Sequence, residues 1–140
     1  MASSFNTKAV ELAARIAATE ASSAGVHWTF APMVDIARDP RWGRVSEGSG
    51  EDSFLGIQMA VANVKGFQGD DLSKTNTVLA CAKHFAAYGA AESGRDYNTV
   101  DISERVLRDT YLPAFKATVD AGVKTFMMSF NEISGVPSTG

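Results

Sequence analysis

The 140-residue sequence contains a single cysteine, Cys81, and no hydrophobic run near the ~20 residues that a membrane-spanning helix needs. A lone cysteine excludes a disulfide or a cysteine-based metal cluster within the chain. Lysine and arginine (13 residues) are fewer than aspartate and glutamate (16 residues), which gives a net charge of −3. This balance provides no basic face for nucleic acid. With 45% hydrophobic residues, the composition is that of one ordinary globular domain.

Several motifs that identify catalytic or nucleotide-binding sites are also missing. The patterns GxGxxG and GxxxxGK[ST] do not occur, so a phosphate-binding loop for a nucleotide is not supported. GxSxG is absent, which leaves a serine hydrolase unsupported. His27 and His84 lie far apart without an HExxH pattern, so they do not indicate a zinc site. We therefore expect no metal and no cofactor, and a phosphate- or nucleotide-binding α/β domain is the weakest alternative.

The chain alternates between helical and strand-like patterns. These patterns predict helices over residues 6–25, 52–65 and 101–122, and strands over residues 26–34, 78–82 and 123–130. Asp101 and Glu104 have the spacing of a capping box at the start of the third helix, and Pro113 predicts a kink or a break within it. Such alternation predicts an α/β fold with parallel strands, in about three consecutive strand–helix steps. Three steps do not decide whether the sheet closes into a barrel.

The first helix and the first strand each carry a distinctive pattern. In the helix, five residues at helical spacing are expected to form a narrow face made mostly of small side chains: Ala9, Leu12, Ala13, Ile16 and Ala17. In the strand, Pro32 is expected to end the hydrogen-bonded ladder, because proline has no N–H to donate.

Long polar loops follow the predicted strands. One covers residues 39–52 (DPRWGRVSEGSGED) and another runs from Phe85 to Val100, whereas the helix-to-strand links are shorter and plainer. Loops longer than about 12–15 residues are usually functional or disordered, and the tryptophan and two arginines of the first loop argue against disorder. Ligands in parallel α/β folds bind beyond the carboxyl ends of the strands. The asymmetry therefore indicates an active face on that side.

Lys83 and His84 are expected where the second strand ends. Neighbouring side chains on a regular strand point to opposite faces, so the backbone must twist for both to reach one ligand. An ammonium group and an imidazole together suit a hydroxyl-rich or anionic ligand. The alternative is a solvent-exposed Lys83 with His84 hydrogen-bonded in the interior.

Arg44 is the candidate binding residue of the first long loop. Its planar set of donors could hold two adjacent hydroxyls or a carboxylate. The alternative is an ion pair within the loop, with Asp35, Asp39 or Glu51 as the partner. Trp42 is expected to anchor the loop to the core rather than to stack on a sugar.

The same loop is rich in carboxylates, which suggests a glycosidase. Such enzymes place two carboxyl groups about 5–5.5 Å or about 6.5–9.5 Å apart, a distance that the sequence does not provide. Asp52 is better explained as a helix cap, and Glu51 as a partner of the loop or of the helix dipole. With Glu47 as the remaining acid, we predict no acid/base pair among these residues.

Four longer stretches of the sequence carry a family resemblance. They read FAPMVDIARDPRWGRVSEGSGED, AKHFAAYG, GRDYNTVDISERVLRDTYLPAFKATVDAG and FMMSFNEISGVPSTG, and together they cover nearly the whole chain. In order and spacing they resemble glycoside hydrolase family 3, in its β-glucosidase/β-xylosidase branch and particularly the bacterial β-glucosidase type. The N-acetylglucosaminidase branch has KHFPGHG where this sequence has KHFAAYG, so the missing proline and second histidine argue against that branch.

The resemblance implies that residues 1–140 are part of an N-terminal domain of the (β/α)8 TIM-like barrel type, incomplete at both ends. Members of the family hydrolyse terminal β-linked sugars such as glucose with retention, through a covalent glycosyl-enzyme. Their nucleophile, an aspartate, is expected beyond Gly140, and the acid/base carboxylate still further on. We therefore expect the sugar-binding part of a retaining, exo-acting β-glycosidase, inactive in isolation. A non-catalytic carbohydrate-binding or scaffold module is the alternative.

The resemblance also assigns sugar-binding residues. Arg44 matches the arginine of the family's WGR motif, and Lys83 and His84 match its Lys-His pair; in the family these bind hydroxyls of the sugar in subsite −1. Arg95 is expected to match a further basic residue of the next loop. Phe130 stands where the family often has tyrosine, so a hydroxyl contact is lost while apolar packing can remain.

The implied partners are a β-glucoside or oligosaccharide substrate and the remainder of the parent chain, without nucleic acid or membrane. The sequence assigns no compartment, and a periplasmic or secreted parent is one alternative.

Overall fold

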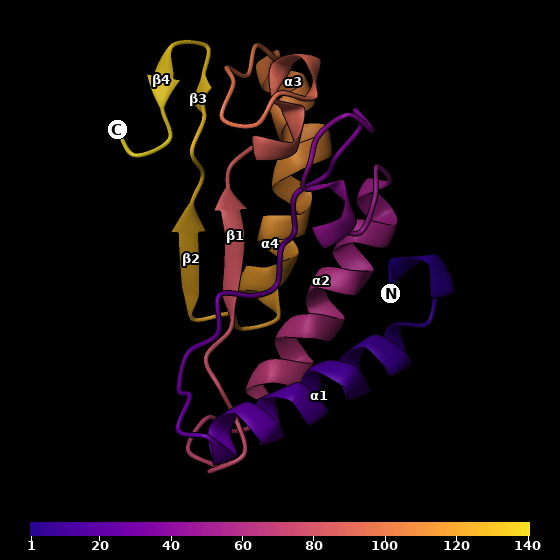
Figure 1. Cartoon of the computed structure of the whole chain (residues 1–140), viewed down its shortest axis with the longest axis vertical. Helices are drawn as coiled ribbons and strands as arrows, with labels where there is room; N and C mark the ends of the chain where they lie inside the picture. The colour runs from indigo at the N-terminus through magenta and orange to yellow at the C-terminus, as the bar shows by residue number, and fades with distance from the viewer.

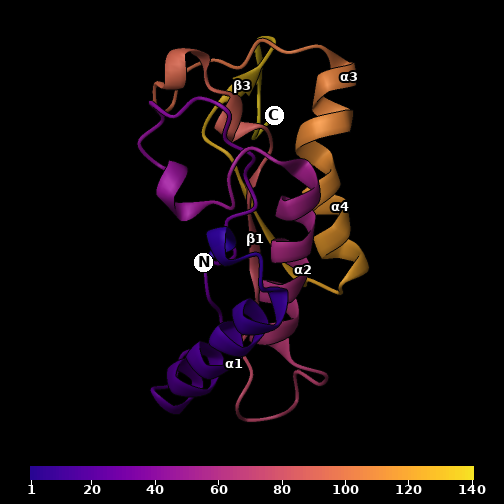
Figure 2. The same cartoon turned by 90° about the vertical axis from the view of Figure 1, so that its right-hand side faces the viewer.

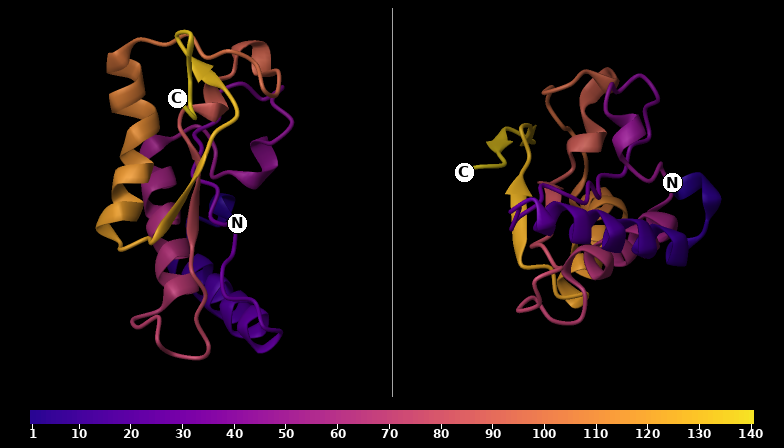
Figure 3. Two further views of the ribbon diagram at one scale, coloured as in Figure 1. Left: turned by 90° about the vertical axis from the view of Figure 1, so that its left-hand side faces the viewer. Right: turned by 60° about the horizontal axis from the view of Figure 1, so that its bottom comes forward.

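The computed structural model describes residues 1–140 as parallel extended segments beside a layer of helices (Figure 1). β1 (Cys81–Phe85) pairs in parallel with β2 (Thr125–Met128), and residues 26–34 run parallel along the other side of β1. Figures 2 and 3 show α2 (Ser53–Gln68) and α4 (Leu112–Asp120) together on one face of the strands. The predicted α/β fold with about three strand–helix steps is confirmed.

The other elements are short, except for the helix α1 (Thr7–Ser23), which packs against α2. Single helical turns and a hairpin complete the chain: η1 (Ala2–Ser4), η2 (Val45–Glu47), η3 (Tyr88–Ala90), η4 (Glu92–Gly94), β3 (Glu132–Ile133) and β4 (Val136–Pro137). No helix in the structure combines the length and the apolar character that crossing a membrane requires.

The starts of the first two helices are confirmed. Asn6 Oδ1 accepts a hydrogen bond from the backbone N–H of Ala9 at 3.0 Å, and Asp52 Oδ1 accepts one from Leu55 at 2.7 Å. Each cap satisfies one of the free N–H groups of the first turn. α2 runs to Gln68 and is closed by Gly69, whose φ of 59° suits glycine.

The predicted start of the third helix is wrong by two residues. Ser103, not Asp101, is the cap, because its Oγ accepts the backbone N–H of Val106 at 3.2 Å. The helix then runs through α3 (Glu104–Val106) and a π-helical turn, η5 (Leu107–Tyr111), into α4. Pro113 lies in the first turn of α4, directly after this π-helical turn, and the chain stays helical on both sides of it. The predicted break with a restart is therefore not found, and the π-helical turn is the local irregularity beside the proline.

The predicted first strand, residues 26–34, forms two isolated bridges instead of a continuous ladder. Pro32 interrupts the pairing but does not end it, because Val34 N still donates to Lys83 O at 2.8 Å. The expectation that the ladder stops at Pro32 is therefore wrong. A proline removes one donor, and the residues on either side of it keep theirs.

The second strand is displaced towards the C-terminus, from 78–82 to Cys81–Phe85. Its partner β2 lies opposite these residues, so the continuous ladder starts at Cys81. Lys83 and His84 consequently lie within the strand and not after it. The pairing register between β1 and β2 shifts between Lys83 and Phe85. Such an irregularity is consistent with the backbone twist that is expected if two adjacent side chains are to reach one ligand.

The buried face of α1 differs from the predicted one. Val10, Ala14 and Ala18 are buried, whereas Leu12 and Ile16 remain 60% and 51% exposed. The cause lies in α2, where a Cβ on Gly66 would come within 2.5 Å of the Ala14 side chain. Glycine thus allows the two helices to approach most closely at Ala14, which turns the Val10–Ala18 side inward.

The loops that follow the three extended segments gather at one end of the molecule, above the tips of β1 and β2 (Figures 1 and 3). Between the strands and the helices lies a small apolar core made of Val34, Ala60, Ala82, Ala86, Ala114 and Phe115. This core supports the end of the sheet at which the predicted polar residues are found.

Candidate functional site

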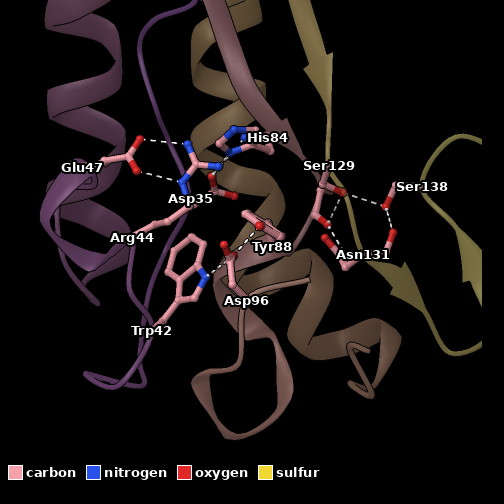
Figure 4. A network of polar contacts seen from close by, with 11 residues as sticks. Asp35, Trp42, Arg44, Glu47, His84, Tyr88, Asp96, Ser129, Asn131 and Ser138 are labelled. Carbon is pink, nitrogen blue, oxygen red and sulfur yellow. Dashed lines mark hydrogen bonds and ion pairs between the residues drawn. The ribbon is translucent and has the colours of Figure 1, made fainter. Parts of the chain in front are cut away.

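A buried pair, Asp35 and His84, lies at the base of the site (Figure 4). Asp35 Oδ2 accepts a hydrogen bond from the His84 backbone N–H at 3.0 Å and lies within hydrogen-bond distance, 2.8 Å, of His84 Nδ1. Both side chains are at most 2% exposed. Burial raises the pKa of Asp35, and the hydrogen bonds from His84 oppose that rise. His84 is therefore hydrogen-bonded in the interior, as one of the two alternatives predicts.

The other ring nitrogen of His84 is open. Nε2 makes no hydrogen bond within the protein, and it is not among the unpaired polar atoms that are closed off from solvent. The ring therefore presents Nδ1 to Asp35 and leaves Nε2 for a ligand. Interior packing and ligand binding are compatible in this residue.

Arg44 is paired with Glu47 in the first long loop (Figure 4). Arg44 Nε donates to Oε1 and Nη2 donates to Oε2, both at 2.8 Å. The predicted partners Asp35, Asp39 and Glu51 are wrong, because the turn η2 places residues three apart on the same side. The pairing lowers the pKa of Glu47 and raises that of Arg44. Arg44 Nη1 makes no hydrogen bond within the protein.

Lys83 is partly buried in β1, and its ammonium group has no ion-pair partner. It nevertheless lies near the other candidates, because its charge and that of His84 add to the effect of Arg44 in lowering the pKa of Glu47. Arg44 pairs with Glu47 directly, whereas Lys83 and His84 act on the Glu47 carboxylate only through their charge. The structure brings together these three predicted residues, which come from two different loops or strands of the sequence.

Trp42 and Tyr88 are buried side by side and share an acceptor, Asp96. Trp42 Nε1 donates to Asp96 Oδ1 at 3.0 Å, and the Tyr88 hydroxyl donates to the same oxygen. Desolvation raises the pKa of Asp96, but these two hydrogen bonds outweigh it, and the net shift is downward. Trp42 anchors its loop to the core, as predicted, and the anchor also connects it to the loop that follows β1.

Tyr88 is the central packing residue of the site. Its ring lies edge-on to His84 with the centroids 5.2 Å apart, and Arg44 Cζ lies 5.7 Å from its centroid. A guanidinium at this distance is attracted by the face of the ring. Burial raises the pKa of the Tyr88 hydroxyl, which therefore stays protonated and donates its hydrogen bond.

Phe130 lies beside the site, whereas Arg95 does not reach it. The Phe130 ring is 5.8 Å from His84 and 5.1 Å from Tyr97, and it is 57% exposed. Arg95 is exposed, and its hydrogen bonds are made by its backbone alone: its N–H donates to Glu92 O and its O accepts from the N–H of Asn98, both at 3.1 Å. The structure places Phe130 where it can pack on a ligand, and the assignment of Arg95 stays a prediction.

The sequence patterns do not indicate the roles of Asp35, Tyr88 and Asp96. For Asp35 the sequence suggests only an ion pair with Arg44. Its position directly after the extended segment 26–34 is the signal that could have marked it as a site residue. Tyr88 and Asp96 lie within the stretches AKHFAAYG and GRDYNTVDISERVLRDTYLPAFKATVDAG that carry the family resemblance, but no local pattern shows that they pair with each other.

The arrangement combines three nitrogen donors with exposed aromatic rings. Arg44, Lys83 and His84 offer cationic or polar nitrogens, which hydrogen-bond to hydroxyl oxygens. The acids nearest to them, Asp35 and Glu47, are already paired. No group of three or more His, Cys, Asp or Glu side chains is arranged to hold a metal ion. The site can therefore hold a hydroxyl-rich ligand.

Comparison with known proteins identifies the family. The model of the glycosyl hydrolase family 3 N terminal domain matches residues 1–140. The chain belongs to glycoside hydrolase family 3. It is 48% identical to a periplasmic beta-glucosidase of Salmonella typhimurium over 99% of its length, and 40% identical to a putative beta-xylosidase of Formosa agariphila.

Solved family 3 structures share its fold closely. A beta-glucosidase from Listeria innocua, in complex with gluconolactone, superposes with a TM-score of 0.96 at 48% sequence identity over 99% of this chain. This chain spans only about a fifth of the length of these relatives, 18% of the Salmonella protein and 20% of the Listeria protein. The chain therefore corresponds to part of these longer glycosidases, and the match confirms the predicted part of a TIM-like barrel domain.

Proposed function

We propose that this chain is the sugar-binding part of a retaining, exo-acting β-glycosidase that hydrolyses terminal β-linked glucose or a similar sugar. The observation that supports the proposal is that Arg44 and His84 both lie against Tyr88, with Lys83 next to His84 near the carboxyl end of β1. These residues hold the sugar, and the nucleophile and the acid/base belong to the parent chain beyond Gly140.

Related structures support a sugar as the ligand. The Listeria beta-glucosidase was solved with glucose, and a mutant of it with laminaribiose. By analogy, the nitrogen donors of this site would bind ring hydroxyls, and Phe130 would pack on the apolar face of the sugar. Because Glu47 already takes two hydrogen bonds from Arg44, it serves as a brace for that residue and not as an acid/base.

The mechanism assigned to these residues is positioning. The reaction passes through an oxocarbenium-like transition state in which the sugar ring flattens. Only contacts that become stronger in that state accelerate the reaction. Hydrogen bonds from Arg44, Lys83 and His84 to the hydroxyls would hold the ring while it changes shape, and they would lose strength if the donors were displaced.

The test is steady-state kinetics of the full-length enzyme with an aryl β-glucoside. Arg44→Ala and Lys83→Ala are each expected to lower kcat/KM about 100-fold or more, which corresponds to about 3 kcal/mol. Arg41→Ala is the matched control, since Arg41 lies in the same loop but is 69% exposed and pairs with Asp39. Near-wild-type kinetics of both site variants would refute the proposal.

The isolated 140-residue chain offers a second test. We expect it not to hydrolyse the aryl β-glucoside, because the catalytic carboxylates are expected outside it. Turnover by the purified chain that is lost on mutation of the site would contradict this.

Titration with glucose, followed by the fluorescence of Trp28 and Trp42, separates the enzyme part from the alternative, a non-catalytic carbohydrate-binding module. Saturable binding by a parent protein that shows no turnover would instead support a carbohydrate-binding module.

A further inference from the structure

We infer that Asp35 is a positioning residue for His84: it holds the imidazole so that Nδ1 carries a proton towards Asp35 and Nε2 faces the sugar. The inference rests on the proposed function, in which His84 contacts the substrate. It assigns a role to an acid whose side-chain hydrogen bonds are all made with His84.

The hydrogen-bond geometry defines both the position and the tautomer of the ring. Asp35 Oδ2 accepts the backbone N–H of His84 at 3.0 Å and lies 2.8 Å from Nδ1 of the His84 ring. The first bond fixes the backbone of His84 and the second fixes the rotation of its ring. The partner of one imidazole nitrogen decides which nitrogen is protonated. A carboxylate accepts only, so a proton lies on Nδ1, and Nε2 is left free to face a sugar hydroxyl.

Packing removes the other orientations of the ring. Tyr88 lies edge-on to His84 at 5.2 Å, and the Phe130 ring lies 5.8 Å away. With His84 at 2% exposure, a rotated ring would lose its partner and leave Nδ1 unpaired among apolar groups. Packing against Tyr88 and Phe130 thus limits the orientations of the His84 ring, and the hydrogen bond to Asp35 selects one of them.

Stability alone gives no reason for a carboxylate at this position. Asp35 is 1% exposed, and its second oxygen, Oδ1, is closed off from solvent without a hydrogen-bond partner. A buried charge with an unsatisfied oxygen is costly, and well-packed apolar residues often replace buried ion pairs without loss of stability. A positioning role explains why an acid stands here, next to both His84 and the charge of Arg44.

The first experiment compares Asp35 variants of the full-length enzyme by steady-state kinetics. Asp35→Ala is expected to lower kcat/KM about 10- to 100-fold, the usual range for a hydrogen bond to a charged group, and Asp35→Asn, which keeps an acceptor oxygen, is expected to lose less. Asp39→Asn is the control, since Asp39 pairs with the exposed Arg41 and is expected to keep wild-type kinetics. Equal kinetics of Asp35→Ala and the wild type would overturn the inference.

A double-mutant cycle with His84→Ala separates positioning from a general structural role. If Asp35 acts through His84, adding Asp35→Ala to His84→Ala produces little further loss. Losses that multiply would overturn the inference. Wild-type kinetics of His84→Ala alone would instead refute the sugar-binding role of His84 and with it the proposed function, so the two failures are distinguishable.

A measurement on the unmutated enzyme keeps the test valid should Asp35→Ala fail to fold. Nitrogen-15 NMR of histidine-labelled enzyme, with His84 assigned by its loss in His84→Gln, reports which ring nitrogen is protonated. We expect a protonated Nδ1. An unprotonated Nδ1 with the proton on Nε2 would overturn the inference.

Discussion

Trp42 Nε1 donates a hydrogen bond to Asp96 Oδ1 at 3.0 Å, across 54 residues of sequence. The bond connects the loop that carries Arg44 to the loop that follows β1. Tyr88 donates to the same oxygen and lies against both Arg44 and His84. The exposed carboxylate of Asp96 therefore holds Trp42 and Tyr88, the two aromatic side chains that support the site, in place.

Asp96→Ala is expected to destabilise the enzyme by about 1–3 kcal/mol, because it leaves the buried indole N–H of Trp42 without an acceptor. The loosened loop is also expected to lower kcat/KM. Asp96→Asn keeps an acceptor oxygen and should be milder. Urea unfolding monitored by tryptophan fluorescence measures the difference, and equal destabilisation by both variants would contradict the assigned role.

Glu47→Gln is expected to reduce the loss of the enzyme's free energy of unfolding at acid pH. The hydrogen bonds from Arg44 lower the pKa of Glu47 below its ordinary 4.5. The stabilisation is therefore fully present above that value and is lost as the pH falls through the lowered pKa. Because the Glu47 side chain is 43% exposed, solvent screening keeps the contribution below about 1 kcal/mol.

The measurement is the free energy of unfolding in urea, taken at about pH 7 and at about pH 3 on either side of the carboxylate range. Between these values the wild type should lose more stability than Glu47→Gln. Glu51→Gln serves as the control, since Glu51 is exposed in the same loop and has no ion-pair partner. An identical loss in wild type and Glu47→Gln would show that the pair adds no stability.

Gly89→Ala is expected to destabilise the site by about 2–3 kcal/mol or more, through overpacking. A Cβ on Gly89 would lie 2.1 Å from Ile36 O, so the backbone next to Asp35 would have to move. Gly43→Ala is the control, because its Cβ would meet nothing within 4 Å. Thermal unfolding of both variants checks the prediction, and similar melting temperatures would contradict it.

Ser103→Ala is expected to cost about 1 kcal/mol by removing the cap of the third helix. Asp101→Ala, at the position that the sequence pattern favours, should change stability by less than about 0.5 kcal/mol, as surface substitutions usually do. Chemical denaturation of the two variants distinguishes the caps. A larger effect at Asp101 would restore the capping box predicted from the sequence.

Local features of the chain could be predicted because their causes are local. Asn6 and Asp52 cap helices through N–H groups three residues away, and Pro113 acts on the turn in which it stands. The alternation of strands and helices predicted the parallel arrangement and the side on which the loops gather. Where two local signals competed, as at Asp101 and Ser103, the pattern did not decide between them.

The sequence by itself determined the element order, the loop face and the candidate residues Arg44, Lys83, His84 and Phe130. Only the tertiary structure decided how they are held. Asp35 and His84 are 49 residues apart, and no periodicity relates them. Their pairing depends on two segments meeting in register in a dry environment, where an unpaired imidazole or carboxylate is costly and a partner is required. Such a requirement arises only after the chain has folded.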